Sequence, residues 1–305
     1  MTKLLVTGGI GLIGSAIQQL CPDATFISRQ EFNLLSPMGV FNMFERYTPD
    51  AVIHLAGKVG GVATNTQYPV DFFEENVLIN TLVLQTAHKF NVKRVLSCMS
   101  TCVFPDNVEY PLQPNKIHLG EPHSSNFGYA YAKRMLEVQT RAYQTQYNKQ
   151  WFTVIPTNVY GPHDNYNLKT SHVIPALIHK CYLAKQNDTP LHIWGSGRAI
   201  REFIYSKDLA ELMLRLIDNY DSNDPIILSS PNQYSVSEVV EMIASLMNFK
   251  GEIIYDNVGP EGQYRKPSDI TPLQTLYPDF KYTPFSDGMK NSIDWFCNNY
   301  NSARI

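Results

Sequence analysis

Short apolar runs alternate with longer amphipathic segments through the first half of the chain. Five of these runs have the length and composition of buried strands, and they span residues 3–7, 24–27, 51–55, 95–98 and 152–155. The segments between them place apolar residues three and four apart, as helices do, over residues 12–20, 36–47, 70–90 and 129–147. Strands and helices that alternate at this spacing predict βαβ units and a parallel sheet.

The pattern loosens in the second half. Helical spacing recurs at residues 173–184, 208–218, 235–247 and 285–300, with short strand patterns at 191–194 and 226–228. The run from Pro156 to Pro175 is rich in Pro, Gly, Asn and Asp, which predicts a functional loop at a scaffold edge. We therefore expect an α/β protein of two parts. A Rossmann-type doubly wound domain spans 1–161, with returning segments near 200–230, and a smaller α/β substrate lobe spans 162–305.

Composition narrows the class of protein. The chain has 305 residues, 44% of them apolar, and a net charge of −3, with its Lys and Arg scattered. These values fit a full globular core and disfavour nucleic acid or an anionic membrane as the main partner. No run reaches the roughly 20 apolar residues that span a bilayer, and no signal-peptide pattern opens the chain. The five cysteines are odd in number and widely spread, which predicts free thiols, no metal site and a cytoplasmic protein.

A glycine-rich turn joins the first predicted strand to the first helix. Residues 7–14, TGGIGLIG, contain G-x-G-x-x-G and, one residue earlier, G-x-x-G-x-x-G. Glycine lets the backbone approach a pyrophosphate, and the following helix N-terminus offers free N–H donors. A simple glycine turn is the alternative, but the strand–turn–helix context favours a dinucleotide site. We assign to it Gly8, Gly11, Leu12, Ile13 and Gly14, together with Leu55 and Ala56 after the third strand.

The end of the second predicted strand indicates which cofactor is bound. NAD-binding proteins usually have a carboxylate there for the ribose 2′-hydroxyl, whereas this chain has Ser28 and Arg29. A guanidinium suits a 2′-phosphate, so we predict NADPH/NADP+. Glu31 lies close by and leaves NAD as the alternative.

A third pattern predicts proton transfer to a carbonyl oxygen. Tyr129 and Lys133 lie four apart on one predicted helix, so their side chains share a face. A lysine beside a phenol favours the phenolate, which eases proton exchange near neutral pH. Ser100 follows the fourth predicted strand and can meet the same substrate oxygen. The three residues together predict a hydride-transfer site.

These motifs resemble the extended short-chain dehydrogenase/reductase superfamily and, in detail, its GDP-L-fucose synthase family. The detailed likeness is carried by residues 100–105 (STCVFP), 156–165 (PTNVYGPHDN), 171–180 (SHVIPALIHK), 194–197 (WGSG) and 201–205 (REFIY). It implies a bifunctional 3,5-epimerase and NADPH-dependent 4-reductase that converts GDP-4-keto-6-deoxy-D-mannose to GDP-L-fucose. It also implies a homodimer formed by the helices at 70–90 and 129–147. Residues three or four apart could form one stripe on each helix: Phe73, Val77, Asn80, Leu84 and Ala87 on the first, and Met135, Val138, Ala142 and Gln146 on the second.

The resemblance also assigns roles to single residues. Cys102 and His172 match the family's acid/base positions for inverting C3 and C5, and thiol and imidazole pKa values suit that chemistry near pH 7. Asn158 is implied near the cofactor or sugar, while the contacts to GDP fall on Lys180, Trp194, Arg201 and Lys266. Lys180 and Ile10 stand where bacterial relatives often carry arginine, so the NADP prediction depends on Arg29.

Two other functions remain open at this point. A 4-epimerase that retains oxidised NAD would use the same fold, although Arg29 and the Cys102/His172 pair argue against it. A catalytically silent NADP-binding regulator would be expected to have lost Ser100, Tyr129 or Lys133, and all three are present.

Overall fold

The computed structural model describes residues 2–256 and 264–305. Its main element is a six-stranded sheet in the order β2-β1-β3-β4-β5-β9, with every pairing parallel. Its strands are β1 (Leu4–Thr7), β2 (Thr25–Ile27), β3 (Ala51–His54), β4 (Arg94–Cys98), β5 (Gln150–Pro156) and β9 (Ile226–Leu228). The predicted α/β, doubly wound fold class is confirmed.

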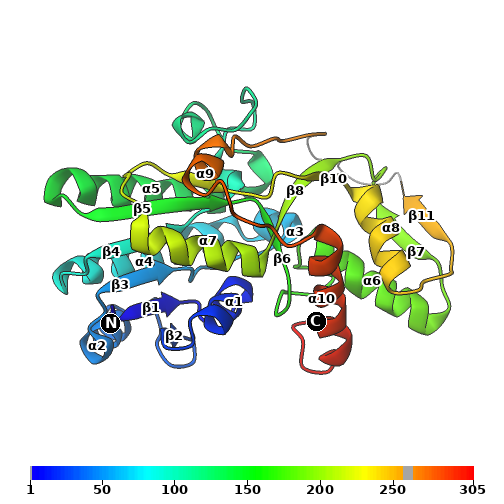
Figure 1. The fold of residues 1–305 in the computed structure, drawn as a ribbon, viewed down its shortest axis with the longest axis horizontal. Helices are drawn as coiled ribbons and strands as arrows, with labels where there is room; N and C mark the ends of the chain where they lie inside the picture. The colour runs from blue at the N-terminus through cyan, green and yellow to red at the C-terminus, as the bar shows by residue number, and fades with distance from the viewer. Residues whose placement is uncertain (1, 257–263) are drawn as a thin grey trace.

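Helices cover both faces of this sheet (Figure 1). The helices of the described residues are, in chain order, α1 (Leu12–Leu20), α2 (Pro37–Tyr47), α3 (Val62–Gln67), α4 (Pro69–Lys89), α5 (Phe127–Tyr147), α6 (Val173–Asn187), α7 (Ser206–Asn219), α8 (Val236–Leu246), α9 (Thr271–Leu276) and α10 (Phe285–Asn298). Three short 3-10 turns are η1 (Thr101–Val103), η2 (Pro114–Lys116) and η3 (Ser124–Asn126). The helix start predicted at Ser235 is a capping box with Glu238.

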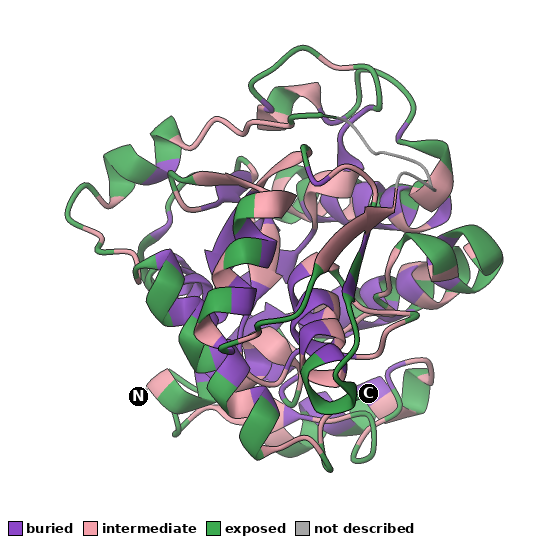
Figure 2. Ribbon diagram, turned by 90° about the vertical axis from the view of Figure 1, so that its right-hand side faces the viewer, coloured by how far each residue is buried: buried purple, intermediate pink, exposed green. Residues whose placement is uncertain are grey.

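The sheet separates two apolar cores. Successive strand residues point to opposite faces, so Leu5 packs with α2, α4 and α5 while Val6 packs with α1 and α7. The same alternation holds for Trp151 and Phe152. Figure 2 shows buried segments gathered at the centre and exposed helix faces outside. Burial on both faces explains why these strands read as nearly continuous apolar runs.

Outside the six-stranded sheet, the chain forms two smaller sheets and a third apolar core. A three-stranded sheet joins β10 (Gln233–Ser235), β8 (Ile200–Tyr205) and β6 (Asn158–Tyr160), and a two-stranded sheet joins β11 (Ile253–Asp256) to β7 (Leu191–Trp194). Figure 1 shows β6 and β8 between the large sheet on the left and α6, α8, β7 and β11 on the right. Stacked aromatic rings fill this core, including Tyr166 on Phe296 and Tyr234 on Phe285.

The structure corrects the prediction for part of the second half. Residues 158–160 were expected in a loop, and residues 200–205 were given no strand, yet they form β6 and β8 and pair in parallel. Each strand is short and depends on a partner more than 40 positions away, so local periodicity could not reveal them. No helix in the described residues is both long and apolar enough to cross a membrane.

Candidate active site

The glycine turn between β1 and α1 has no room for side chains at several positions, among them Gly8 and Gly14. Gly8 has φ +71°, and a Cβ there would stand 3.0 Å from the backbone nitrogen of Ala56. A Cβ at Gly14 would stand 2.5 Å from the carbonyl oxygen of Gly8. Gly11 caps α1 without any side-chain hydrogen bond, so the first N–H groups of the helix stay available to an anion. This cradle fits the pyrophosphate of a dinucleotide.

Residues beyond β2 favour a 2′-phosphate. Arg29 is exposed, and no ion pair to it is found among the described residues. The Glu31 carboxylate accepts the hydroxyl hydrogen of Tyr47 at 2.6 Å and lies 3.5 Å from Arg46. Because Tyr47 and Arg46 bind the Glu31 carboxylate, the Arg29 guanidinium is available to bind a 2′-phosphate.

A buried network missed by the sequence analysis holds the adjoining backbone. The Thr7 hydroxyl oxygen accepts hydrogen bonds from the N–H groups of Leu55 and Ala56, both at 3.2 Å. The hydroxyl therefore donates to Nδ1 of His54 at 2.8 Å, which leaves Nε2–H to donate to Asn80 Oδ1 at 3.0 Å. Burial lowers the pKa of His54 to about 3, so the ring is neutral. A histidine inside the apolar run 51–55 was the available signal.

The proton-transfer residues meet at the carboxyl end of β4. Ser100 precedes η1, while Tyr129 and Lys133 project from α5. The Lys133 ammonium is buried, donates to the carbonyl oxygen of Cys98 at 2.8 Å, and lies 5.8 Å from the centre of the Tyr129 ring. The three predicted residues thus lie on two elements that pack together around one turn.

The pKa of Tyr129 differs from the expectation. Burial, and then the nearby Cys102 and Cys98 thiols, raise the pKa of the phenol well above its usual value. The lowering expected from Lys133 is not found; its ammonium donates to the Cys98 carbonyl oxygen. Tyr129 is therefore protonated at neutral pH in this structure, which suits a proton donor.

Cys102 lies in η1, two residues beyond Ser100. Burial raises the pKa of its thiol, whereas a hydrogen bond with Ser100 and the charges of Lys266 and Lys133 lower it. His172 precedes α6 and is exposed, but desolvation by the surrounding protein lowers the pKa of its imidazole. Both groups are neutral near pH 7, so the imidazole can accept a proton and the thiol can donate one.

The two halves of this site are tied together by α3. The Gly61 N–H at its start donates to the carbonyl oxygen of Thr170 at 2.9 Å, beside His172. At its other end, the single hydrogen of the Thr66 hydroxyl is shared between the carbonyl oxygens of Val62 at 3.0 Å and of Ser125, just before α5, at 3.2 Å. This short helix therefore links the His172 loop to the helix that carries Tyr129.

The predicted substrate residues fall into two groups. Lys266 reaches residues 100–103, named here the catalytic turn, where its ammonium donates to the carbonyl oxygen of Thr101 at 3.3 Å. Arg201 lies on the neighbouring β8. Lys180 and Trp194 form a separate pair in the lobe, with the ammonium 4.3 Å from the indole ring and the indole 72% exposed. An exposed indole with a cation against it is a platform for a planar or anionic ligand.

In this structure the Asn158 side chain makes a structural contact between two strands. Its amide donates to the carbonyl oxygen of Glu202 at 2.8 Å, which fastens β6 to β8. Asn76, which the sequence analysis missed, is fully buried, donates to the Lys58 and Phe72 carbonyls, and accepts from the Lys58 N–H. Gly57 lies against this amide and near Lys133, so Asn76 holds the loop after β3 in place.

A dinucleotide cradle beside a Ser/Tyr/Lys group on a doubly wound sheet defines a nucleotide-dependent oxidoreductase or epimerase. Residues 4–236 match the NAD dependent epimerase/dehydratase family, and the chain belongs to that family.

The relatives narrow the class. The chain is 44% identical to a GDP-L-fucose synthase of Dictyostelium discoideum, over 99% of this chain and 97% of the relative. It is 32% identical to a GDP-L-colitose synthase of Yersinia pseudotuberculosis, over 98% and 99% of the two chains. A crystal structure of a GDP-L-fucose synthetase from Naegleria fowleri bound to NADP has 40% identity and a TM-score of 0.95, with 100% of this chain and 95% of that chain covered.

Proposed function

We propose that this protein is a bifunctional enzyme that converts GDP-4-keto-6-deoxy-D-mannose to GDP-L-fucose. Its two activities are inversion at C3 and C5 and NADPH-dependent reduction at C4. The observation that carries the proposal is the catalytic turn, where Ser100 and Cys102 lie beside the Tyr129/Lys133 pair within one site. The identity of 44% to a GDP-L-fucose synthase over nearly the whole chain supports the same reaction.

The first activity needs two proton-exchanging groups. Hydrogens on the carbons beside a 4-keto group are acidic, because their removal leaves an enolate. Inversion requires that a proton leaves one face of the carbon and another returns to the opposite face. Cys102 and His172 are the two groups with suitable chemistry, and they come from different elements of the site. Tyr129 and Ser100 would stabilise the enolate oxygen by hydrogen bonding.

The second activity uses the protonated phenol. NADPH supplies the hydride for C4, and Tyr129 protonates O4. Lys133 is buried beside the phenol and holds the nicotinamide ribose in this proposal. Gly8, Gly11 and Gly14 leave space for the pyrophosphate, with Leu12 and Ile13 in the helix start and Leu55 and Ala56 beneath it. Arg29 contacts the 2′-phosphate, and the NADP-bound relative from Naegleria fowleri supports this cofactor.

The GDP moiety is assigned to the substrate lobe. Lys180 and Trp194 form one cation–aromatic platform, and Arg201 supplies a second cation for the diphosphate. In this proposal residues 1–161, with returning segments near 200–230, hold the cofactor, and 162–305 hold mainly the substrate. The pairing of β9 with β5 supports the returning segment.

The decisive test is incubation with GDP-4-keto-6-deoxy-D-mannose and NADPH, with the product identified by sugar NMR. We expect stoichiometric NADPH oxidation and a sugar inverted at C3 and C5. Reduction without inversion would reject the bifunctional proposal, and no reduction at all would reject the reductase. A fixed cofactor that does not exchange with free NADPH would favour a 4-epimerase.

A second candidate follows from one relative. The GDP-L-colitose synthase of Yersinia pseudotuberculosis matches 98% of this chain at 32% identity, so a related GDP-sugar is the nearest competing product. Competition between the two sugar nucleotide precursors at equal concentration would separate the two functions by the ratio of kcat/KM.

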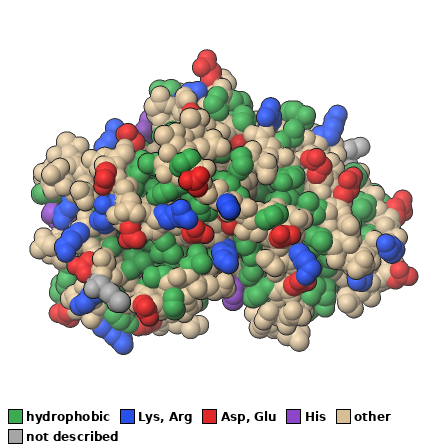
Figure 3. Space-filling view, in the orientation of Figure 1, with side chains coloured by type: hydrophobic (Ala, Val, Ile, Leu, Met, Phe, Trp, Pro, Cys, Tyr) green, Lys and Arg blue, Asp and Glu red, His purple; other side chains and the backbone are tan. Residues whose placement is uncertain are grey.

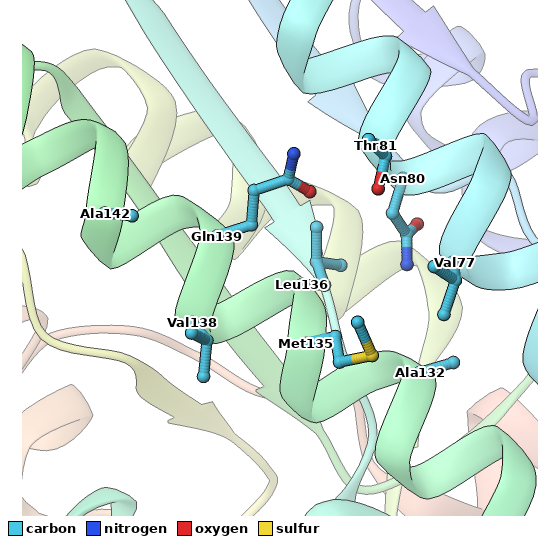
Figure 4. Close-up of a pocket in the computed structure, with 9 residues that line it drawn as sticks. All are labelled: Val77, Asn80, Thr81, Ala132, Met135, Leu136, Val138, Gln139 and Ala142. Carbon is cyan, nitrogen blue, oxygen red and sulfur yellow. The ribbon is translucent and has the colours of Figure 1, made fainter.

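We also infer a homodimer formed by α4 and α5. The predicted stripe on α5 is exposed at Met135 and Val138, while Asn80, Leu84 and Ala87 of the α4 stripe are turned inward. A cavity of about 310 Å³ opens along the seam of the two helices (Figure 4). Its lining residues are Val77, Asn80, Thr81, Ala132, Met135, Leu136, Val138, Gln139 and Ala142. An apolar seam of this kind favours a second copy that buries at least ~1,000 Å² in total.

Sedimentation at micromolar concentration tests the dimer. Wild type should sediment as a dimer, and the double variant M135E/V138E should sediment as a monomer, because it places charge in the seam. The exposed Leu276→Glu on α9, which packs in the core on the other face of the sheet, is the matched control. A wild-type monomer would reject the dimer and leave the chemistry untouched.

The protein is proposed to be cytoplasmic. All five cysteines are free thiols, which is typical of a reducing compartment. Figure 3 shows basic and acidic side chains intermingled on the face drawn, in keeping with a small-molecule substrate rather than nucleic acid. Cell fractionation tests the location.

A further inference from the structure

Residues 264–269, named here the crossing segment, run from the substrate lobe to the large domain. At one end the Ile200 N–H of β8 donates to the Tyr264 carbonyl oxygen at 2.7 Å. At the other end the Leu112 N–H donates to the Pro267 carbonyl oxygen at 2.8 Å. The crossing segment is therefore fastened to both parts of the protein.

Between these two ends the crossing segment meets the catalytic turn. Lys266 is half-buried, and its ammonium donates to the carbonyl oxygen of Thr101 at 3.3 Å. Thr101 is the neighbour of Cys102, so the Lys266 charge lies beside the residue proposed to exchange protons. That charge lowers the pKa of the Cys102 thiol and partly offsets the effect of burial.

A carboxyl group on β8 holds the middle of the crossing segment. Glu202 is only 6% exposed, and its Oε1 accepts the Ser268 N–H at 2.9 Å. The same oxygen accepts from Gln233 Nε2 at 2.9 Å, and Gln233 Oε1 accepts from Arg265 Nε at 2.7 Å. Two residues of the crossing segment, Ser268 and Arg265, are thus tied to Glu202, one directly and one through Gln233.

Burying the carboxyl group of Glu202 costs free energy, so its position calls for a functional explanation. A buried carboxyl group loses its hydration, and only hydrogen bonds compensate for that loss. Its second oxygen, Oε2, is buried and has no hydrogen-bond partner among the described residues. Among the described residues, the side-chain bonds of Glu202 that leave the β10-β8-β6 sheet go to the crossing segment, so the function of the carboxyl group is to be sought there.

We propose that Glu202 is a positioning residue for proton exchange, which holds the crossing segment so that Lys266 stays against the turn that carries Cys102. The proposal deepens the function given above and rests on it. Hydride transfer depends on Tyr129 and Lys133, which are held by α5 instead. Loss of Glu202 should therefore impair epimerisation far more than cofactor binding.

Other charged groups also lie close to the turn that carries Cys102. The ionisable groups of the described residues that interact with Cys102 or Lys266 are Lys133, Tyr129 and Arg134 from α5, Arg201 from β8 and Asp106 from the loop after η1. None of them is bonded to the Glu202 carboxyl group in the described structure, so a change at Glu202 acts on the turn through the crossing segment.

The test measures solvent deuterium uptake at C3 and C5 in the E202A variant. NADP+ replaces NADPH, so that no hydride is transferred, and the sugar nucleotide is kept saturating. We expect uptake to slow on the order of 10- to 100-fold, because a small displacement of a catalytic group has such effects. The pH profile of uptake should also move to higher pH, because the thiol loses its neighbouring cation. The Kd of NADPH should stay within about twofold.

The matched control is Asp208→Asn. Asp208 is also a buried carboxylate on the β8–α7 stretch, and it accepts from the Thr283 N–H and hydroxyl, which fastens a different C-terminal segment. Its loss should lower the Tm without moving the pH profile. A shift of the profile in Asp208→Asn as large as that in E202A would overturn the proposal.

A double-mutant cycle asks whether Glu202 acts through Lys266. K266M should slow uptake and shift its profile in the same direction, and adding E202A to K266M should change uptake by less than about twofold. Additive effects would overturn the proposal. If E202A does not fold, E202Q keeps the side-chain shape with a weaker, neutral acceptor, and about threefold slower uptake is expected. A wild-type rate and profile in E202Q would then overturn the proposal.

The same experiments separate this inference from the proposed function. If wild type takes up no deuterium at C3 or C5, the epimerase function itself fails. If wild type exchanges and E202A exchanges equally fast with the same pH profile, only the role of Glu202 fails.

Discussion

The proposed reductive group, Ser100, Tyr129 and Lys133, and the proposed epimerising group, Cys102, His172 and Lys266, share one candidate site but are held in different ways. The reductive group sits at the end of β4 and on α5, against a sheet buried on both faces. In the epimerising group, His172 follows a loop and Lys266 lies on the crossing segment.

This difference has a physical rationale. Hydride transfer needs a fixed distance between cofactor, carbonyl and proton donor, and a packed sheet supplies it. Proton exchange at two carbons needs groups on both faces of the sugar, which one sheet edge cannot provide. Of the second set, Cys102 lies on the same turn as Ser100, whereas His172 and Lys266 come from the later part of the chain, so the two activities should be separable by mutation.

The largest effect is expected for Tyr129→Phe. This variant lacks the proton for O4, so reduction should fall on the order of 10²–10⁴-fold while the Kd of NADPH hardly changes. The measurement is single-turnover NADPH oxidation together with cofactor titration. Tyr131→Phe, on the same helix but exposed, is the control and should keep full activity. Wild-type turnover in Tyr129→Phe would remove the phenol from the mechanism.

The corresponding variants for epimerisation are Cys102→Ser and His172→Asn. Each should slow solvent deuterium uptake at C3 or C5 by at least ~10²-fold and leave NADPH binding unchanged. The exposed Cys297→Ser and His123→Asn serve as matched controls. If either active-site variant labels both carbons at the normal rate, that residue exchanges no proton, and the division into two groups loses that member.

A smaller effect is expected at the cofactor edge. Arg29→Asp should weaken NADPH far more than NADH, since it replaces a phosphate partner by a like charge, and a lost charge-assisted hydrogen bond is worth about 1.5–3 kcal/mol. Titration with both cofactors measures the ratio. Arg46→Asp, which pairs with Glu31 nearby, controls for general charge effects. Equal weakening of NADPH and NADH would show that Arg29 does not contact the 2′-phosphate.

The smallest effect concerns stability and also differs between the two parts of the protein. The pKa of His54 is lowered to about 3 by burial, so the unfolded state binds the extra proton and acid destabilises the fold between about pH 6.5 and 3. The pKa of Asp164, beside the stacked rings of the lobe, is raised to about 7 by burial. Its folded form holds the proton, so its contribution is present at low pH and is lost as pH rises toward 7.

Urea unfolding at pH 7 and pH 5 tests these opposite signs. Compared with wild type, His54→Gln should lose about 2 kcal/mol of acid destabilisation between the two pH values. Asp164→Asn should lose a stabilisation of similar size on acidification. An unchanged pH dependence in either variant would mean that the group titrates alike in the folded and unfolded states.

Local patterns in the sequence determined the parallel sheet, the glycine turn and the Tyr129/Lys133 pair. Each is encoded within a few neighbouring residues: an apolar run buried on both faces, a turn that excludes Cβ atoms, and two positions one helical turn apart. The predicted helices agree with α4, α5 and α6 to within three residues at each end, because long amphipathic periodicity is a strong signal.

Only the tertiary structure decided how distant residues meet. The short strands β6 and β8 exist because they pair with each other. The stripe on α4 is partly buried against the sheet and partly exposed at the seam with α5, because the elements packed around the helix decide which of its residues are covered. The Thr7–His54–Asn80 network joins residues far apart in the chain, and so does the hydrogen bond from the Ser268 N–H to Glu202. Hydrogen bonds between remote elements leave no periodic trace in a sequence, because they depend on where the folded chain brings the polar groups together.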